Sequence, residues 1–137
     1  MDRRSFLKGT AAGVALASSA PAVVGSAKPR VVVIGGGAGG ATAARYLAKD
    51  SKGALDVVLI EPTRTYYTCF FSNLYIGGYR DFASIGHTYG KLASDYGIAV
   101  VHDWATGIDR DKKTVALASG TQIGYDRVIV APGIDFK

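Results

Sequence analysis

With 137 residues and a formal net charge of +5, the chain is long enough for one modest hydrophobic core. Residues 1–27 hold three basic residues and one acidic residue, so the remaining chain carries only +3. It has no Lys/Arg cluster with interleaved aromatic residues, which argues against nucleic-acid binding. One cysteine and two separated histidines lack the spacing of metal ligands, so we expect no metal site.

Residues 1–27 have the pattern of an export signal. They begin MDRRSFLK, in which Arg3 and Arg4 stand as in a twin-arginine signal, and continue with a weakly apolar run of Ala, Gly and Ser. This run is shorter than the roughly 18 residues of a membrane span, so we expect no stable span. An anchoring N-terminal helix is the alternative. We expect a twin-arginine signal peptide at 1–27, cleavage after Ala27, and a periplasmic mature segment at 28–137.

Residues 31–60 have the order of a strand, a helix and a second strand. The β-branched run VVVI at 31–34 is typical of a strand that is buried on both faces. Small residues at helical spacing follow between 40 and 47, and VVLI at 57–60 is a second buried run. A helical crossover this short predicts that the two strands are parallel.

The glycines between the first strand and the helix are spaced G-x-G-x-x-G, as in a dinucleotide-binding turn. We expect Gly35 to permit the tight turn, Gly37 to let the backbone approach a pyrophosphate, and Gly40 to let the helix lie close to the strand. The helix N-terminus then offers N–H groups to the phosphates, and Glu61 can accept a hydrogen bond from a ribose hydroxyl. A glycine-rich loop without a ligand is the alternative.

The middle of the chain has weaker signals. Residues 62–81 show no clear periodicity, and long irregular stretches of this kind are often functional. A short amphipathic helix is expected at 89–96, where Gly97 ends it. The apolar run at 98–101 predicts a third buried strand.

The last third of the chain completes an α/β pattern. Alternating residues and turn signals at 104–125 favour an antiparallel meander, and 127–131 is another apolar strand. Gly133 follows that strand at its carboxyl end, where ligands bind in open α/β sheets, although a plain strand-ending glycine is the alternative. We therefore expect an incomplete Rossmann-like FAD/NAD(P)-binding domain, with a parallel sheet and a small antiparallel meander.

The only cysteine, Cys69, lies in the aromatic segment YYTCFFSN at 66–73. In an exported chain it has no partner for an internal disulfide. The residue type and its aromatic neighbours favour a buried, small apolar side chain. A thiol paired with another chain, a redox thiol and a covalent tether for the cofactor are the alternatives.

Several segments together resemble the flavoprotein subunit of flavocytochrome c sulfide dehydrogenase. This family is a branch of the flavoproteins with two dinucleotide-binding domains, which also include sulfide:quinone reductases and type II NADH dehydrogenases. The resemblance covers most of 28–137. It rests on VVVIGGGAGGATAA at 31–44, LIEP at 59–62, YYTCFFSN at 66–73, IGG at 76–78, VVHDWATGIDRDKK at 100–113 and GYDRVIVAPGI at 124–134. The glycine motif is widespread, whereas YYTC followed by SN and IGG is much more specific.

The resemblance implies that the cofactor is FAD. It implies that Gly35, Gly37 and Gly40 hold the FAD pyrophosphate and that Glu61 binds the adenosine ribose. Gly133 matches the family's closing glycine near FAD. Cys69 matches the family's cysteine that forms a thioether with the 8α-methyl carbon of the flavin. The resemblance therefore favours the tether among the alternatives for this thiol.

The resemblance also implies a periplasmic sulfide:cytochrome c oxidoreductase. In this family a cysteine pair attacks sulfide and passes two electrons to the flavin, which delivers them singly to a haem c subunit. That pair would lie beyond residue 137, so we expect no catalytic residue here and regard 28–137 as the N-terminal part of the FAD domain, from a fragment or a truncated gene product. The alternatives are an FAD oxidoreductase that reduces quinone or oxidises NADH, and a truncated, non-catalytic remnant that binds FAD weakly or not at all.

Overall fold

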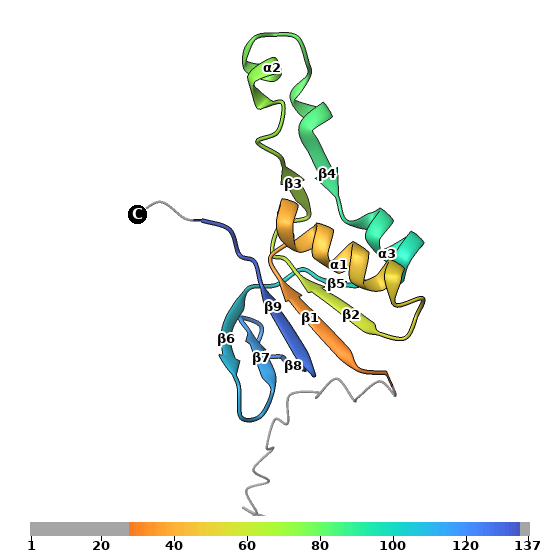
Figure 1. The fold of residues 1–137 in the computed structure, drawn as a ribbon. Coiled ribbons are helices and arrows are strands. Elements are labelled where there is room, and N and C mark those ends of the chain that lie inside the picture. Colours follow the sequence, from red (N-terminus) through yellow and green to blue (C-terminus); the bar gives the residue numbers. More distant parts are fainter. Residues whose placement is uncertain (1–27, 135–137) are drawn as a thin grey trace, which may run out of the picture.

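A computed structural model of the chain describes residues 28–134, so the expected signal peptide at 1–27 lies outside the described residues. A four-stranded sheet in the order β5-β2-β1-β9 forms its centre (Figure 1). These strands are β1 Arg30–Ile34, β2 Asp56–Ile60, β5 Ala99–Val101 and β9 Arg127–Val130. All three pairings are parallel, as the sequence predicts, so the four carboxyl ends lie along one edge.

One face of the sheet is covered by helices. They are α1, Ala38–Asp50, and α3, Gly90–Tyr96, which lie side by side in Figure 1. The buried residues that join them to this face are Val33, Ala44, Val57, Leu59, Tyr89 and Ile98. Small residues on α1 bring the helix close to the strands, and this contact fixes the position of its N-terminus.

The other face is covered by an antiparallel meander of β6 Ala105–Asp109, β7 Thr114–Leu117 and β8 Gln122–Gly124. Alternate strand residues point to this face, because side chains along a strand alternate between its two sides. The buried cluster here is Val32, Ile34, Val58, Ile60, Val115, Leu117 and Ile123. The predicted α/β class, the parallel sheet and the meander are all confirmed.

Residues 65–88 form an arm that projects from the carboxyl edge of the sheet (Figure 1). β3 Thr65–Tyr67 and β4 Gly86–Thr88 pair antiparallel at its base, and α2 Ser72–Ile76 and the 3-10 helix η1 Phe82–Ile85 complete it. The expectation of an irregular segment at 62–81 is therefore wrong for β3 and α2. A strand of three residues is too short to show a period, and its partner lies about twenty residues away along the chain.

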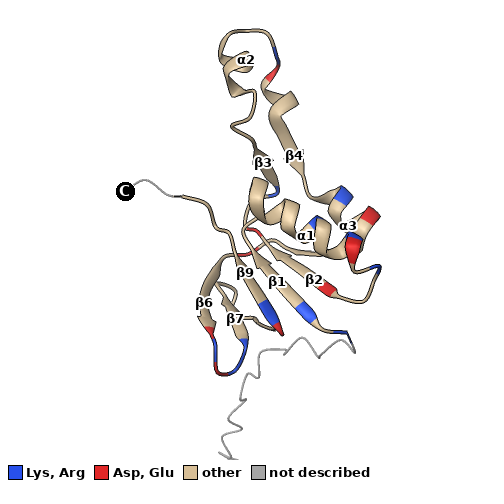
Figure 2. Cartoon of the chain, viewed as in Figure 1, with Lys and Arg blue, Asp and Glu red and all other residues tan. Residues whose placement is uncertain are grey.

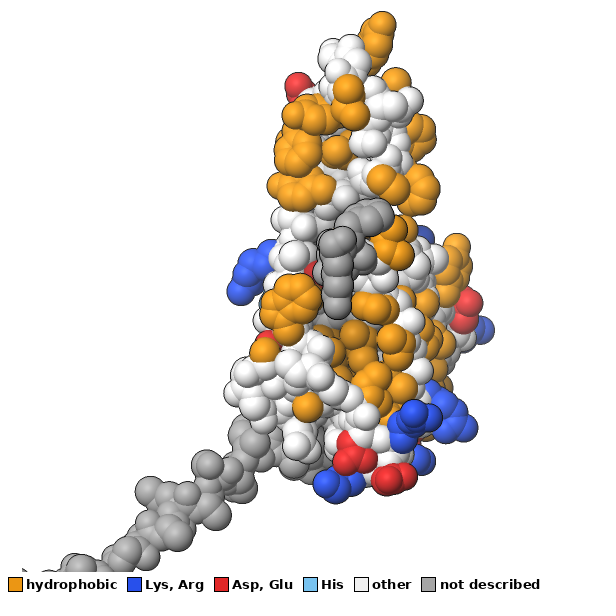
Figure 3. Space-filling model, turned by 90° about the vertical axis from the view of Figure 1, so that its left-hand side faces the viewer, with side chains coloured by type: hydrophobic (Ala, Val, Ile, Leu, Met, Phe, Trp, Pro, Cys, Tyr) orange, Lys and Arg blue, Asp and Glu red, His pale blue; other side chains and the backbone are white. Residues whose placement is uncertain are grey.

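Large apolar side chains on the arm are exposed. They are Tyr67, Phe70, Phe71, Tyr75, Ile76, Tyr79 and Phe82. Figure 2 shows few charged residues on the arm, and Figure 3 shows apolar side chains gathered over it. The Tyr67 and Phe82 rings stack at 4.5 Å between centroids and join its two limbs. Ring contacts and the pairing of β3 with β4 thus join the two sides of the arm, while most of its large apolar side chains stay exposed.

Candidate functional site

The turn after β1 depends on two glycines that approach other backbone closely. Gly35 has φ +100°, and a Cβ on it would overlap the carbonyl group of Ala131. A Cβ on Gly40 would overlap the carbonyl oxygen of Gly35. The tight turn and the close helix therefore occur where the sequence predicts them, while binding of a cofactor by these residues stays a prediction.

The N-terminus of α1 is open toward the carboxyl edge of the sheet. The helix begins after Gly37, has no capping side chain, and has no acidic residue in its first turn. Its first N–H groups have no acceptor within the helix, because helix geometry leaves them unpaired. A Cβ on Gly37 would meet only the Tyr66 ring, at 3.9 Å. This end of the helix is thus available to an anion such as a pyrophosphate.

Gly36, which the motif leaves unspecified, links the turn to side chains from two other segments. Its N–H donates to Glu61 Oε2 at 2.7 Å, and the Tyr89 hydroxyl donates to its carbonyl oxygen at 3.0 Å. A Cβ would lie 2.7 Å from the Tyr89 hydroxyl and 2.8 Å from Glu61 Cγ. Burial, followed by the negative charge of Glu61, raises the pKa of Tyr89 to about 12, so its hydroxyl keeps its proton. Sequence reasoning missed both Gly36 and Tyr89.

Glu61 anchors the turn in addition to its expected role toward a ribose. Its Oε1 accepts hydrogen bonds from the Thr63 N–H at 2.9 Å and the Thr63 hydroxyl at 2.6 Å, while Oε2 accepts from Gly36. A carboxylate has about four acceptor positions, so capacity for one further donor remains. Burial raises the pKa of Glu61, but these hydrogen bonds outweigh burial and leave the pKa below its ordinary value.

We predict that the ionised Glu61 carboxylate stabilises the folded protein and that this stabilisation is lost in acid. Its folded pKa is lowered, so the unfolded state binds more protons near pH 4.5, and the free energy of unfolding falls as the pH drops through the folded value. Glu61→Gln should cost about 2 kcal/mol at pH 7 and should flatten the dependence of stability on pH below about 4.5. Urea unfolding between pH 3 and 7 measures both effects. Asp111→Asn, in an exposed hairpin, is the control, and equal pH profiles for the two variants would contradict the prediction.

Two cavities along the carboxyl edge of the sheet meet at Glu61. The larger, about 560 Å³, runs from Gly37 past Tyr66 to Gly133. The smaller, about 250 Å³, lies between Glu61 and Trp104. Gly133 has φ +83°, and the chain turns there just after β9. The two cavities share Glu61 and Pro132 and together form a groove along this edge, and the first residues of α1 line the larger cavity. The groove thus brings an anion-binding helix N-terminus and the Glu61 carboxylate to one place, as the binding of a dinucleotide requires.

The smaller cavity is bounded by an exposed indole ring. Trp104 is 66% exposed, and the Asp103 carboxylate accepts hydrogen bonds from the backbone N–H of Trp104 at 2.7 Å and from the backbone N–H of Ser119 at 3.3 Å. An exposed aromatic face beside Glu61 can stack on a purine base. Sequence reasoning assigned Trp104 only to the start of the meander. A large aromatic residue just after the third parallel strand was the available signal.

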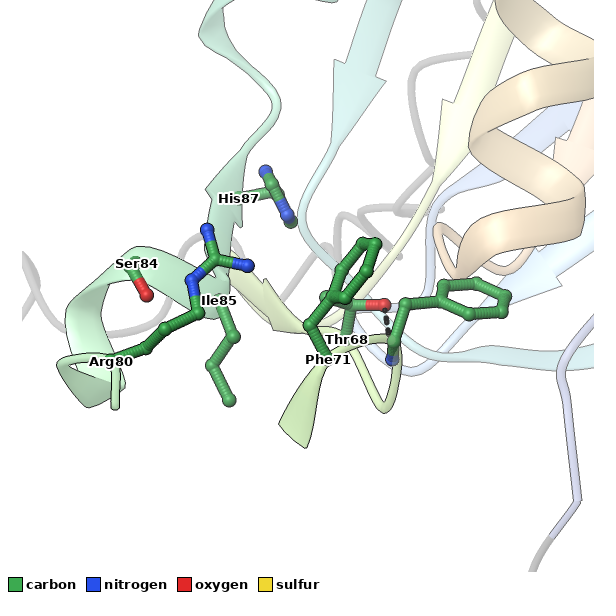
Figure 4. A pocket seen from close by; sticks show the side chains of 7 residues that line it. Thr68, Phe71, Arg80, Ser84, Ile85 and His87 are labelled. Atoms are coloured by element: carbon green, nitrogen blue, oxygen red, sulfur yellow. Dashed lines mark hydrogen bonds between the residues drawn. The ribbon is translucent and has the colours of Figure 1, made fainter. Parts of the chain in front are cut away.

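Cys69 lies apart from this groove, on the arm. The thiol is exposed, so the expectation of a buried apolar side chain is wrong. Cys69 lies in the turn after β3, and in this turn the preceding residue, Thr68, is buried while Cys69 is not. Thr68 and Phe70, on either side of Cys69, line a third cavity of about 370 Å³ (Figure 4). An exposed thiol is available for covalent chemistry, whereas a buried one is not.

Neither histidine is placed to hold a metal. His102 Nδ1 lies 3.0 Å from the Glu61 carbonyl oxygen, so its ring contacts backbone. His87 pairs with Tyr66 across the base of the arm. Within 28–134, no three His, Cys, Asp or Glu side chains come together as metal ligands would, and no helix has the length and apolar character needed to cross a membrane.

Residues 29–136 match the pyridine nucleotide-disulphide oxidoreductase family. The chain belongs to this family. Its members are FAD-dependent oxidoreductases. Like this chain, the pyridine nucleotide-disulphide oxidoreductases place their glycine turn after the first strand of a Rossmann-like sheet.

Family members that handle sulfide are among the proteins most similar to the chain. It is 36% identical over 105 residues to the sulfide-quinone reductase of Aquifex aeolicus, covering 75% of the chain and 24% of that protein. It is 52% identical over 44 residues to the sulfide dehydrogenase [flavocytochrome c] flavoprotein chain of Chlorobaculum thiosulfatiphilum, covering 32% of the chain and 90% of that sequence. The solved Aquifex aeolicus sulfide:quinone oxidoreductase matches with a TM-score of 0.71 and 30% identity, over 80% of the chain and 25% of that structure. The chain thus spans about a quarter of the length of the Aquifex relative.

Proposed function

We propose that residues 28–134 form part of the FAD site of a periplasmic sulfide:cytochrome c oxidoreductase, which passes electrons from sulfide through FAD to a haem c subunit. The observation that carries the FAD assignment is the groove in which two cavities meet at Glu61, beside the open N-terminus of α1. The finer assignment is supported by the 52% identity to the flavocytochrome c flavoprotein chain. The sequence of the first 27 residues supports export.

The described residues would bind FAD along its length. The N–H groups that follow Gly37 would hold the pyrophosphate, Glu61 the adenosine ribose, and Trp104 the adenine. Gly133 would pass close to the cofactor at the far end of the larger cavity. When bound, FAD supplies a centre that accepts two electrons together and releases them one at a time.

Cys69 would tether the cofactor. Formation of the C–S bond would break the S–H bond of Cys69 and one C–H bond of the 8α-methyl group. Overall this is a two-electron oxidation, so two protons and two electrons would leave to an acceptor such as dioxygen. The exposed thiol on the arm supports this proposal, because a buried thiol would be out of reach. A tether also keeps the cofactor in the protein after export.

The test is the intact mass of the denatured protein, purified from its own host. We expect a chain that begins at Lys28 and carries one FAD. A chain that still has residues 1–27 would contradict export, and a denatured chain without flavin would contradict the tether. Native protein without any flavin would favour the non-catalytic remnant.

A quinone-linked enzyme is the second candidate, because the longer match is to a sulfide-quinone reductase. The two candidates differ in the acceptor and in the tether. We expect the sulfide-reduced protein to reduce a c-type cytochrome faster than a soluble quinone analogue. The reverse order, together with flavin that is released on denaturation, would favour the quinone enzyme.

A further inference from the structure

The turn that carries Cys69 contains a backbone conformation that its sequence does not favour. Phe71 has φ 64° and ψ 11°, in the left-handed region that a large aromatic residue rarely occupies. Phe71 is 62% exposed, so burial of its side chain does not offset the cost of this conformation. Such strain persists only where surrounding contacts impose it, and it concentrates at functional positions.

Hydrogen bonds within the turn fix the residues on both sides of the thiol. The Phe70 N–H donates to the Thr68 hydroxyl at 3.2 Å, and the Ser72 N–H donates to the Cys69 carbonyl oxygen at 3.2 Å. Thr68 is itself buried and donates its N–H to the Ile85 carbonyl oxygen at 3.0 Å. The backbone of Cys69 is therefore held while its side chain stays exposed.

Arg80, in the segment between α2 and η1, contacts the strained residue Phe71. The Arg80 guanidinium lies 5.5 Å from the centroid of the Phe71 ring, within the range of a cation–π interaction. Figure 4 shows the two side chains reaching toward each other beside the cavity that Thr68 and Phe70 also line. Both residues are exposed, so this contact adds little to a hydrophobic core.

We propose that the Arg80–Phe71 contact positions the Cys69 thiol for its bond with the flavin methyl group. Arg80 holds the Phe71 ring, the ring holds the left-handed backbone, and that backbone sets the direction of the turn two residues after the thiol. The inference rests on the proposed tether. Neither residue touches the groove at the sheet edge, so non-covalent binding of FAD does not depend on them.

Arg80→Met should slow formation of the thioether by about tenfold or more, because small displacements of a reacting group have large effects on rate. The full-length protein is prepared without flavin and mixed with FAD. Acid-stable flavin fluorescence of the denatured protein gives the time course of bond formation, and absorbance of the desalted native protein gives total FAD. We expect the first readout to fall and the second to be unchanged.

Three variants separate positioning from general damage. Arg80→Lys keeps the cation and Phe71→Tyr keeps the aromatic ring. Each single variant should therefore form the thioether at a rate close to that of the unaltered protein. Phe71→Leu should resemble Arg80→Met, and the double variant should be no slower than either alone. Tyr79→Leu, 83% exposed beside Arg80, is the matched control and should have no effect.

Two results would overturn the inference while leaving the tether intact. One is Arg80→Met with an unaltered rate. The other is an Arg80→Met variant in which total FAD falls in proportion to covalently bound flavin, which would indicate a purely structural role. An unaltered protein without acid-stable flavin would instead contradict the proposed tether, and the inference would fall with it.

Discussion

Alanine in place of Gly40 should destabilise the protein by about 3 kcal/mol or more and prevent FAD binding. The added Cβ would overlap the Gly35 carbonyl oxygen, with the Ala131 side chain at 3.5 Å on the same side. Relief would require α1 to move away from the sheet or the turn to open, and either movement displaces the helix N-terminus from the groove. Urea unfolding and titration with FAD measure the two effects.

Gly90→Ala is the matched control for this prediction. Gly90 begins α3, and a Cβ there would meet nothing within 4 Å. Because alanine favours helix more than glycine does, this variant should be unchanged or more stable by up to about 1 kcal/mol. If Gly40→Ala were as stable as Gly90→Ala, the close contact between α1 and the turn would be absent from the protein in solution.

Serine in place of Cys69 should leave FAD bound to the native protein but release it completely on denaturation. The thiol is the only one in the chain, and it lies on the arm, outside the groove that would hold the nucleotide. Its removal therefore takes away the covalent bond without altering the glycine turn. Acid precipitation followed by flavin fluorescence of the pellet and of the supernatant measures the outcome.

Cys69→Ala provides the control, because alanine has neither the thiol of cysteine nor the hydroxyl group that serine introduces. Both variants should retain the flavin absorbance of the native protein. Flavin that stays with the denatured pellet in either variant would show that another residue forms the bond, and Cys69 would lose its assigned role.

The sequence was most informative where strands are buried on both faces. The runs at 31–34 and 57–60 are continuous and β-branched, because both sides of these strands contact a cluster of buried residues. The glycine turn was equally clear, since steric limits at Gly35 and Gly40 allow no other residue type. The parallel pairing and the meander followed from these patterns and from turn residues.

The rest of the site depends on contacts between distant segments. Tyr89 reaches Gly36 across 53 positions of the sequence, and neither residue type signals this hydrogen bond. The exposure of Cys69 was mispredicted because the usual behaviour of a free cysteine is burial, whereas the arm has too little core to bury it. Trp104 was missed as a site residue because its role depends on the strand order, which brings β5 beside β2.

The separation of the glycine turn from Cys69 would make FAD, bound as proposed, a two-point ligand. One end would be bound to the sheet and the other to a projecting arm that has few buried contacts of its own. Once one end is attached, the other encounters its partner at a high effective concentration, so occupancy at each point reinforces the other. Loaded protein should therefore show slower amide hydrogen exchange in β3 and β4 than protein without flavin, with much smaller changes in β1 and β2.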